Sequence, residues 1–264
     1  MGKVYCSSDW HGCWDPAYRV IEYLKPNDKL YFLGDAIDRG KDGIKLMNKL
    51  LTDDRVIYLK GNHEEFMEKS LPLLIEGRSD SVSDNWLYQN GGYHTYNAIE
   101  YCSDESKMWY VNKIRHMPLE VKYTSPKGHT VIMEHAGYTP FGIPHRTHDP
   151  LWDREHFYDK WSDNEEEQSN PEINKTYLIH GHTPTVYLKY HYGYKDMPKI
   201  TKRDNIEKRQ FFKNIVLDGE EIIKPEVIRY CDGHKFDIDL CTVASGRIAL
   251  IDLDTFEIIY FDKE

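Results

Sequence analysis

Aspartate, histidine and asparagine stand beside glycine in four short segments of this sequence. The segments are SSDWHG (residues 7–12), GDAIDRG (34–40), KGNHE (60–64) and HGHTP (180–184). Each follows a short apolar run of the kind that forms a buried β-strand. Carboxylate, imidazole and amide groups bind divalent cations, and the arginine and lysine among them attract phosphate. Together, the four segments predict a two-metal phosphoester hydrolase.

The candidate metal ligands come from the predicted strand ends. Asp9 and His11 are separated by one residue, and in an extended backbone such side chains face the same way. Asp35 is the natural carboxylate bridge between two ions, because parallel strands gather their carboxyl ends at one edge of a sheet. Mixed oxygen and imidazole ligands favour two divalent ions, Mn²⁺ first with Fe or Zn²⁺ as alternatives, over Ca²⁺. The remaining candidates follow later strands and are Asn62, His135 and His182.

A second group of residues is predicted to handle the phosphate and a proton. His63 is a candidate general acid, and Asp38 is the candidate carboxylate that orients its ring. Arg39 and Arg154 carry planar guanidinium groups that match the oxygens of a phosphate. Lys60 is a weaker candidate, because a lysine before a turn is usually solvated.

Each of these residues, taken alone, also fits an ordinary structural role. Aspartate after glycine is common in turns, and Asn-His beside glycine often begins a helix. Asp38 could pair with Arg39, and His63 could lie on the surface. Two-metal chemistry is favoured because all of the candidate ligands follow predicted strands, in a chemically complementary order.

The motifs GDxxDRG and GNHE, with DWHG before them and GHTP after them, resemble the phosphoprotein phosphatase family of calcineurin-like metallophosphoesterases. The similarity is to the bacterial and phage type, which includes bacteriophage lambda phosphatase and diadenosine tetraphosphatases. It spans residues 3–261. GDxxDRG and GNHE are highly specific as a pair.

The resemblance implies a role for each candidate residue. Asp35 would bridge two ions, His63 and Asp38 would form the acid pair, and two arginines would bind the phosphate. The phosphate-binding residues would be Arg39 and Arg154. The ligands of the first ion would be Asp9, His11 and Asp35. The ligands of the second ion would be Asp35, Asn62, His135 and His182.

The sequence departs from the family pattern at three places. Lys60 stands where the family usually has arginine, so that a point charge replaces a bidentate fork. Ala136 replaces the first glycine of the usual His-Gly-Gly. An insertion at about residues 189–234 follows GHTP, where it could narrow the cleft or recruit a partner.

The expected reaction is hydrolysis of a phosphomonoester by direct in-line attack of a metal-bridging hydroxide, with His63 protonating the leaving group. No covalent phosphoenzyme is expected, because Cys13 lacks the usual setting of a phosphatase thiolate. The first expected substrate is a protein phosphorylated on serine or threonine, with tyrosine in addition. The alternative is diadenosine tetraphosphate or another nucleotide or small phosphoester. A non-catalytic, metal-binding interaction module is the alternative from a different class.

The composition of the chain restricts the classes of binding partner and the cell compartment that we expect. The chain has 264 residues and a formal net charge of −10, which argues against binding to bulk nucleic acid or to an anionic membrane. Its 5 cysteines are odd in number and lack CxxC spacing, as expected for reduced thiols in the cytoplasm. No segment has the length of a membrane span, and a strand begins at once, so we expect no signal peptide. No feature of the sequence specifies an oligomeric state.

The apolar pattern predicts alternating strands and helices in the first half of the chain. Strands are expected at residues 3–8, 29–33 and 56–59, and helices at 17–24, 43–51 and 64–75. The region that follows is expected to form a mainly helical cap. It contains a polar stretch over 79–101, with Gly91 and Gly92, and a helix over 105–115.

The second half of the chain has the character of β-structure. Ser245 and Gly246 are expected to form a hairpin turn, and residues 213–217 and 221–224 a hairpin inside the insertion. The predicted fold is α/β (α+β), with two mixed β-sheets packed as a sandwich and flanked by helices. Residues 1–264 are expected to form a single domain. The strands are predicted at 119–123, 130–135, 176–180, 235–240, 247–252 and 257–261.

Overall fold

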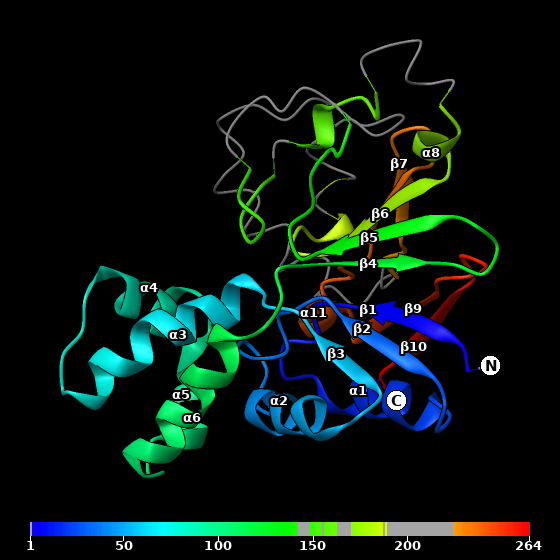
Figure 1. The fold of residues 1–264 in the computed structure, drawn as a ribbon. Coiled ribbons are helices and arrows are strands. Elements are labelled where there is room, and N and C mark those ends of the chain that lie inside the picture. Colours follow the sequence, from blue (N-terminus) through cyan, green and yellow to red (C-terminus); the bar gives the residue numbers. More distant parts are fainter. Residues whose placement is uncertain (1, 142–147, 155, 163–169, 187, 189–223) are drawn as a thin grey trace.

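Two mixed β-sheets of five strands each lie at the centre of the computed structural model (Figure 1). The structure describes residues 2–141, 148–154, 156–162, 170–186, 188 and 224–264. The first sheet has the order β10-β9-β1-β2-β3, with β1, β2 and β3 parallel and β9 and β10 antiparallel to their neighbours. Its strands are β1 (Val4–Ser7), β2 (Lys29–Phe32), β3 (Val56–Tyr58), β9 (Arg247–Asp252) and β10 (Ile258–Asp262).

The second sheet has the order β4-β5-β6-β8-β7. Its central strands β5, β6 and β8 are parallel, and the edge strands β4 and β7 are antiparallel to them. The strands are β4 (Glu120–Thr124), β5 (Thr130–Glu134), β6 (Thr176–His180), β7 (Ile228–Tyr230) and β8 (Lys235–Asp237).

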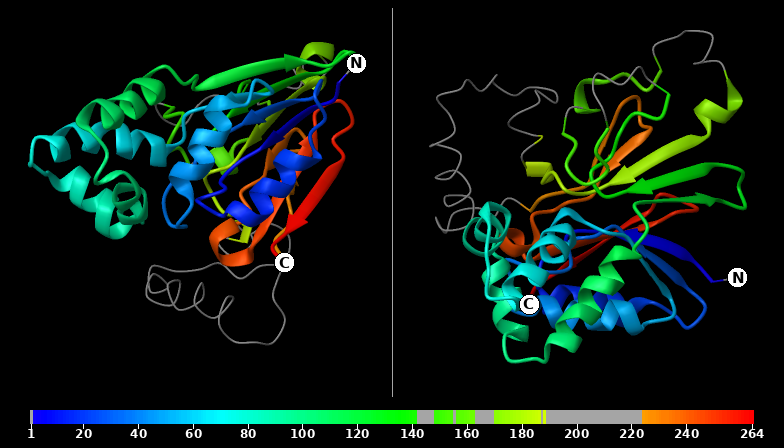
Figure 2. Two further views of the ribbon diagram at one scale, coloured as in Figure 1. Left: turned by 90° about the horizontal axis from the view of Figure 1, so that it is seen from below. Right: turned by 60° about the vertical axis from the view of Figure 1, so that its left-hand side comes forward.

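An apolar cluster joins the two sheets. Cys6 and Ile251 enter this cluster from the first sheet, and Met133, Ile179 and Phe236 enter it from the second. Because side chains alternate between the two faces of a strand, one face of each sheet is free to bury such residues against the other. The views in Figure 2 show the two layers of strands stacked on each other. The predicted sandwich of two mixed sheets is confirmed.

Helices cover the outer face of the first sheet (Figure 1). These are α1 (Trp14–Tyr23) and α2 (Gly43–Thr52). Ala17, Val20 and Ile21 recur at the spacing of one helical face and are buried in the cluster that also contains Leu30 and Phe32 of β2. The packing fixes β1 and β2, and with them the loops that follow these strands.

A layer of four helices lies at one end of the first sheet (Figure 1). The helices are α3 (Asn62–Ile75), α4 (Ser81–Gln89), α5 (Gly92–Ile99) and α6 (Asp104–Arg115). The expected helical cap is therefore present, and the polar stretch within it is itself helical. Asp80 and Ser103 are the N-cap residues of α4 and α6. Their side-chain oxygens accept from the backbone N–H groups of Ser83 and Ser106.

Two predictions in the second half are corrected by the structure. The expected turn at Ser245 and Gly246 is wrong, since Ser245 ends a short helix and Gly246 caps it with a φ of 66°. Within the predicted insertion, Ile228–Tyr230 forms strand β7, which pairs with β8. The hairpin predicted at residues 213–217 and 221–224 lies outside the described residues, apart from Lys224. The other short helices are η1 (His156–Tyr158), α8 (Pro171–Asn174) and α11 (Thr242–Ser245).

Within the described ranges, no helix combines the length and the apolar character that crossing a bilayer requires. All 5 cysteines carry free thiols.

Candidate metal centre and acid pair

The predicted ligands gather at one edge of the two sheets, beyond the carboxyl ends of their strands. Asp9 and His11 follow β1, and Asp35 follows β2. Asn62 is the first residue of α3, which begins shortly after β3. The second sheet contributes the two residues that follow β5 and β6, which are His135 and His182. The structure thus brings all of the candidate ligands together from both sheets.

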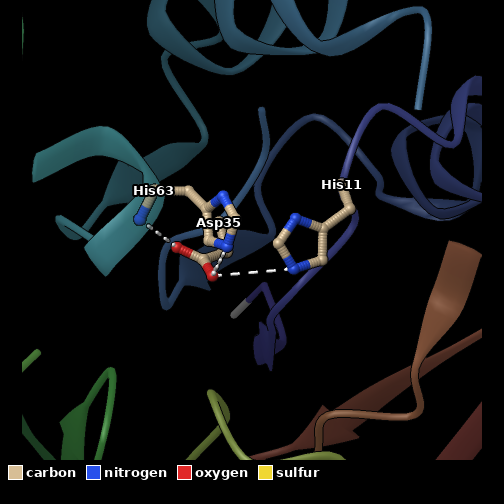
Figure 3. A group of neighbouring side chains, drawn as sticks. All are labelled: His11, Asp35 and His63. Carbon is tan, nitrogen blue, oxygen red and sulfur yellow. Dashed lines mark hydrogen bonds and ion pairs between the residues drawn. The ribbon is translucent and has the colours of Figure 1, made fainter. Parts of the chain in front are cut away.

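Asp35 lies between two sets of imidazole rings. Its Oδ2 atom is 3.6 Å from Nε2 of His11 and 3.8 Å from Nε2 of His63 (Figure 3). Its Oδ1 atom is 3.5 Å from Nε2 of His135. The two oxygens of this carboxylate therefore face different ligand groups, which is the arrangement required of a bridge between two ions.

Asn62 connects the remaining ligands. Its Oδ1 atom lies 2.9 Å from Nε2 of His135 and 2.9 Å from Nδ1 of His182. The backbone N–H of His182 donates to Oδ2 of Asp9 at 3.1 Å. The ligands predicted for the second ion are thus adjacent to one another and to Asp9.

Backbone carbonyls fix the orientation of two of the histidine rings. Nδ1 of His11 lies 3.0 Å from the carbonyl oxygen of Ile37, and Nδ1 of His135 lies 2.8 Å from that of Leu33. A carbonyl oxygen only accepts, so Nδ1 carries the proton in each ring. The lone pair on Nε2 consequently faces Asp35, as a metal-binding imidazole requires.

The buried polar atoms of this group fit a pair of divalent cations. Oδ1 of Asp9 and Nε2 of His182 are buried and have no hydrogen-bond partner among the described residues. Burial, then the charge of Asp239, raises the pKa of Asp9 well above its usual value, and burial followed by the charge of Glu64 does the same to Asp35. A bound cation would compensate both carboxylates and fill the position that the unpartnered atoms leave open.

Desolvation keeps the histidines in the form that binds metal. Burial, followed by the charge of Arg39, lowers the pKa of His11 well below its usual value. Burial, followed by the charge of Arg154, lowers the pKa of His182 in the same way. Burial also lowers the pKa of His135 to about 3. The three rings are therefore neutral near pH 7, and neutral imidazole is the ligand form.

The backbone at these positions differs from the predicted one. Asp9 and His11 have φ values of 57° and 42°, so the expectation that an extended backbone aligns their side chains is wrong. With this left-handed backbone conformation, the side chains of both residues still lie close to Asp35. The conformation strains the backbone, which is common at functional sites. The other site residues with positive φ are Asp35, Asp38, Arg39 and His182.

Glu64 fixes the loop that carries Asp35, and the sequence analysis missed it. Its carboxylate accepts from the backbone N–H groups of Asp35 at 2.7 Å, Ala36 at 3.0 Å and Gly61 at 3.0 Å. The hydroxyl of Tyr58 donates to it at 2.8 Å. Glu64 is fully buried. The four donors offset part of the cost of burying its charge, and burial still raises its pKa.

His63 and Asp38 form the predicted pair. Nδ1 of His63 lies 2.7 Å from Oδ2 of Asp38, and both side chains are fully buried. Burial lowers the pKa of His63 well below its usual value and raises the pKa of Asp38 to about 7. The alternative of a surface position for His63 is therefore excluded.

Arg39 lies beside the acid pair and the metal ligands. Its Nη1 atom is 2.9 Å from Nε2 of His11, and its Nη2 atom is 2.9 Å from Nε2 of His63. The guanidinium thus contacts two of the three residues drawn in Figure 3. Arg39 is exposed, but its guanidinium contacts two imidazoles of the site, which the alternative of a surface ion pair does not explain.

Arg154 approaches the same group from the second sheet. Its Nε atom donates to the hydroxyl of Thr183 at 3.2 Å, next to His182. The ring of the neighbouring Trp152 packs edge-on against two other rings. The distance between ring centroids is 5.9 Å to His182 and 5.1 Å to Phe66. The segment that carries Arg154 is consequently anchored on the site.

Lys60 is engaged by an acidic residue of α3. Its Nζ atom forms an ion pair with Oε2 of Glu68 at 2.8 Å, and its side chain is 12 % exposed. The expectation of a solvated lysine is wrong, and Lys60 does not take the place of a phosphate-binding arginine.

Two buried aspartates at the end of β8, Asp237 within the strand and Asp239 just after it, also border the site and were missed. Burial raises the pKa of Asp239 to about 6, and the charge of Asp239 contributes to the raised pKa of Asp9. Oδ2 of Asp237 is buried without a hydrogen-bond partner among the described residues. Both residues lie inside the strand predicted at 235–240, whereas β8 ends at Asp237. The strand-end signal that located the other ligands was therefore placed too late in the sequence to reveal them.

Known structures of similar fold are phosphatases of several kinds. A protein serine/threonine phosphatase from Saccharomyces cerevisiae aligns with 99% of this chain and 80% of its own, at a TM-score of 0.51 and 14% identity. A cold-active protein-tyrosine phosphatase of a psychrophilic Shewanella species aligns with 98% of this chain and 77% of its own. The TM-score is 0.54 and the sequence identity is 14%. At such low identity, these similarities show the fold.

Sequence comparison supplies the family. A symmetrical bis(5'-nucleosyl)-tetraphosphatase of Delftia acidovorans is 26% identical over 141 residues, which are 52% of this chain and 45% of that protein. The chain thus matches less than half the length of this curated relative. The family model of calcineurin-like phosphoesterases matches residues 2–208. The chain therefore belongs to the calcineurin-like phosphoesterase family.

Proposed function

We propose that this metallophosphoesterase is a protein phosphatase that acts on phosphoserine and phosphothreonine, and in addition on phosphotyrosine. The observation that supports this most is the contact of 2.7 Å between Nδ1 of His63 and Oδ2 of Asp38. A buried acid pair is of greatest value when the leaving group is a strong base. The alkoxide of serine or threonine is such a group, whereas a nucleotide released from a phosphoanhydride is a weak base and needs a proton less.

The residues of the site would divide the work as follows. Arg39 and Arg154 bind the phosphate oxygens, for which their planar guanidinium groups are suited. In the structure, Nε2 of His63 accepts from Nη2 of Arg39. With the guanidinium bound to the substrate phosphate instead, the charged form of His63 would deliver a proton from Nε2 to the leaving oxygen, while the carboxylate of Asp38 accepts from Nδ1 and stabilises that form. Glu64 keeps Asp35 in place through the backbone of its loop.

Two divalent ions, bound by the six predicted ligands, would supply an activated water and neutralise charge on the phosphoryl oxygens. We propose Mn²⁺ as the native metal, with Fe or Zn²⁺ as alternatives, because the group mixes carboxylate, amide and imidazole ligands. Asp35 would be the ligand that both ions share, since its two oxygens face different imidazoles.

Hydrolysis of diadenosine tetraphosphate is the second candidate function. It is supported by the curated relatives named symmetrical bis(5'-nucleosyl)-tetraphosphatase, which match about half of this chain. The buried His63–Asp38 pair does not exclude this substrate. The pair favours a phosphomonoester over diadenosine tetraphosphate, because the leaving group of a phosphomonoester is the stronger base.

An activity panel with Mn²⁺ tests the proposal. The substrates are a phosphoserine peptide, a phosphotyrosine peptide, p-nitrophenyl phosphate and diadenosine tetraphosphate. We expect phosphate release from the peptides, and we expect the His63→Asn variant to lose it. Turnover of diadenosine tetraphosphate alone would assign the second function. A protein that binds Mn²⁺ and hydrolyses none of the four would instead be an interaction module.

A further inference from the structure

The helical cap reaches into the site through two side chains that contact Asp38. Trp86 of α4 donates from Nε1 to Oδ2 of Asp38 at 2.8 Å. Thr95 of α5 donates from its hydroxyl to Oδ1 of Asp38 at 2.5 Å. Trp86 is fully buried and Thr95 is 1 % exposed, so water does not compete for either bond. Neither residue has a part in the function proposed above.

These contacts leave Asp38 little freedom to move. Its Oδ2 atom accepts from both His63 and Trp86, and its Oδ1 atom accepts from Thr95. The backbone N–H of Asp38 donates in turn to the hydroxyl of Thr95 at 2.9 Å. Asp38 has a φ of 69°, a conformation that needs such support in a residue other than glycine. The cap therefore fixes both the main chain and the carboxylate of this residue.

Gly91, which precedes α5, and Gly92, its first residue, make the approach of the cap possible. A Cβ atom on Gly92 would lie 2.4 Å from Nε1 of Trp86, the atom that donates to Asp38. Gly91 has a φ of 79°, and its carbonyl accepts from the backbone N–H of Arg39 at 3.1 Å. A Cβ atom on Gly91 would lie 2.8 Å from that same nitrogen. The glycine pair is thus required where the cap meets Asp38 and Arg39.

We propose that Trp86 and Thr95 are positioning residues, which hold Asp38 so that His63 presents Nε2 to the leaving oxygen. The helices α4 and α5 would then contribute to catalysis by positioning Asp38, in addition to their structural role. This inference rests on the proposed function, in which His63 is the general acid and Asp38 its orienting carboxylate. Both residues would act through Asp38, without touching the substrate.

The bond from Trp86 can be separated from its packing. The indole belongs to the apolar cluster that also contains Met67, Leu71 and Val111, so a small side chain would leave a cavity. Phenylalanine keeps most of the ring and removes the N–H donor. Thr95→Val likewise keeps the shape of the side chain and removes the hydroxyl.

The test compares two substrates that differ in how much they need an acid. Glycerol 2-phosphate releases a basic alkoxide, and p-nitrophenyl phosphate releases a weakly basic phenolate. For Trp86→Phe and Thr95→Val, with Mn²⁺ bound, we expect kcat on glycerol 2-phosphate to fall about tenfold, the equivalent of one hydrogen bond to a charged group. We expect kcat on p-nitrophenyl phosphate to change less than about threefold. KM and the bound metal per protein should stay as in the wild type.

Two further variants act as controls. Trp161→Phe removes another buried indole donor: Nε1 of Trp161 donates to the carbonyl of Ile173 at 3.2 Å, in a cluster that packs on Ile132 and Leu178 of the second sheet. It should leave the ratio of the two kcat values unchanged. Thr95→Ser keeps the hydroxyl and should restore turnover of glycerol 2-phosphate.

The outcomes separate this inference from the function on which it rests. If Trp86→Phe and Thr95→Val slow both substrates equally, as Trp161→Phe could by loosening the fold, the two residues are structural and the inference is overturned. The His63→Asn variant tests the acid itself. If it too slows both substrates equally, the acid assignment has failed and the inference fails with it. A selective loss in His63→Asn without one in the cap variants overturns the inference alone.

Discussion

Nη2 of Arg39 donates toward Nε2 of His63 across 2.9 Å. The guanidinium and the imidazole approach each other because Asp38 and Arg39 both adopt left-handed backbone conformations, with φ values of 69° and 62°. One sharp bend of the chain thus places the carboxylate that orients His63 on one side of the ring and a cation on the other. Arg39, the proposed phosphate-binding residue, and Asp38, which orients the proposed acid His63, are therefore positioned by the same few backbone atoms.

Arg39→Lys should separate the charge of this residue from its geometry. Lysine keeps the positive charge but cannot contact His11 and His63 at the same time. We expect kcat/KM for a phosphomonoester to fall about tenfold to a hundredfold, the loss of one or two charge-assisted hydrogen bonds. Steady-state kinetics measures this. Arg78→Lys, at an exposed ion pair with Glu76, is the matched control and should be neutral.

His63→Asn should remove the proton donor and leave the metal ligands in place. We expect turnover of an alkyl phosphate to fall by about two to four orders of magnitude. Metal content by elemental analysis should match the wild type, because His63 is not among the predicted ligands. Unchanged turnover would contradict the assignment of His63 as the acid.

Asp35→Asn should abolish the effect of metal on stability. In the wild type, Mn²⁺ compensates buried carboxylates, so its addition should raise Tm and its removal by a chelator should lower Tm and abolish activity. The Asn variant lacks the bridging charge and should bind less metal and show no rise in Tm. Thermal unfolding with and without Mn²⁺ measures both effects. A variant that still gains Tm on addition of Mn²⁺ would show that Asp35 is not a shared ligand.

His148 should make stability depend on pH in the alkaline range. Its ring contacts Glu134 at 2.9 Å and Asp153 at 3.4 Å. Burial alone would lower its pKa, but the hydrogen bonds to Asp153 and Glu134 outweigh burial and raise the pKa from 6.5 to about 9. A raised folded-state pKa means that the charged ring stabilises the fold fully below about pH 6.5. This contribution is then lost as the pH rises through about 9.

Denaturant unfolding at several pH values checks this prediction. The difference in unfolding free energy between the wild type and His148→Gln should be largest near pH 6.5 and should shrink toward zero above pH 9. A difference that stays constant over that range would falsify the role of the charged ring. The loop held by His148 carries Arg154, so KM for a phosphomonoester should rise in parallel with the loss of stability.

The strand-end positions were predictable from the sequence because polar groups there follow clear apolar runs. Asp239 was missed because the strand that precedes it was predicted to continue to residue 240, whereas β8 ends at Asp237. Glu64 was less visible, since its partners are mostly backbone N–H groups that no residue type reveals. The backbone at Asp9 and His11 was predicted wrongly, because a left-handed φ in a residue other than glycine leaves no trace in composition.

The strand β7 and the bounds of α4 and α5 were not predicted, because these segments lack a clear apolar pattern. β7 has three residues, Ile228–Tyr230, too few to show an alternating pattern against a polar background. α4 and α5 bury polar atoms as well as apolar ones, so the region reads as a polar stretch. Trp86 and Thr95 lie on these helices, and what they contact lies about fifty residues earlier in the chain.

The backbone N–H of His182 bonds the carboxylate of Asp9, a residue 173 positions earlier. The ligands are thus shared between β-sheets whose strands are synthesised far apart in time. The full set of predicted ligands therefore exists only once the chain has been made as far as His182. Ions bound by these ligands would link the two sheets to each other, in addition to the apolar cluster between them.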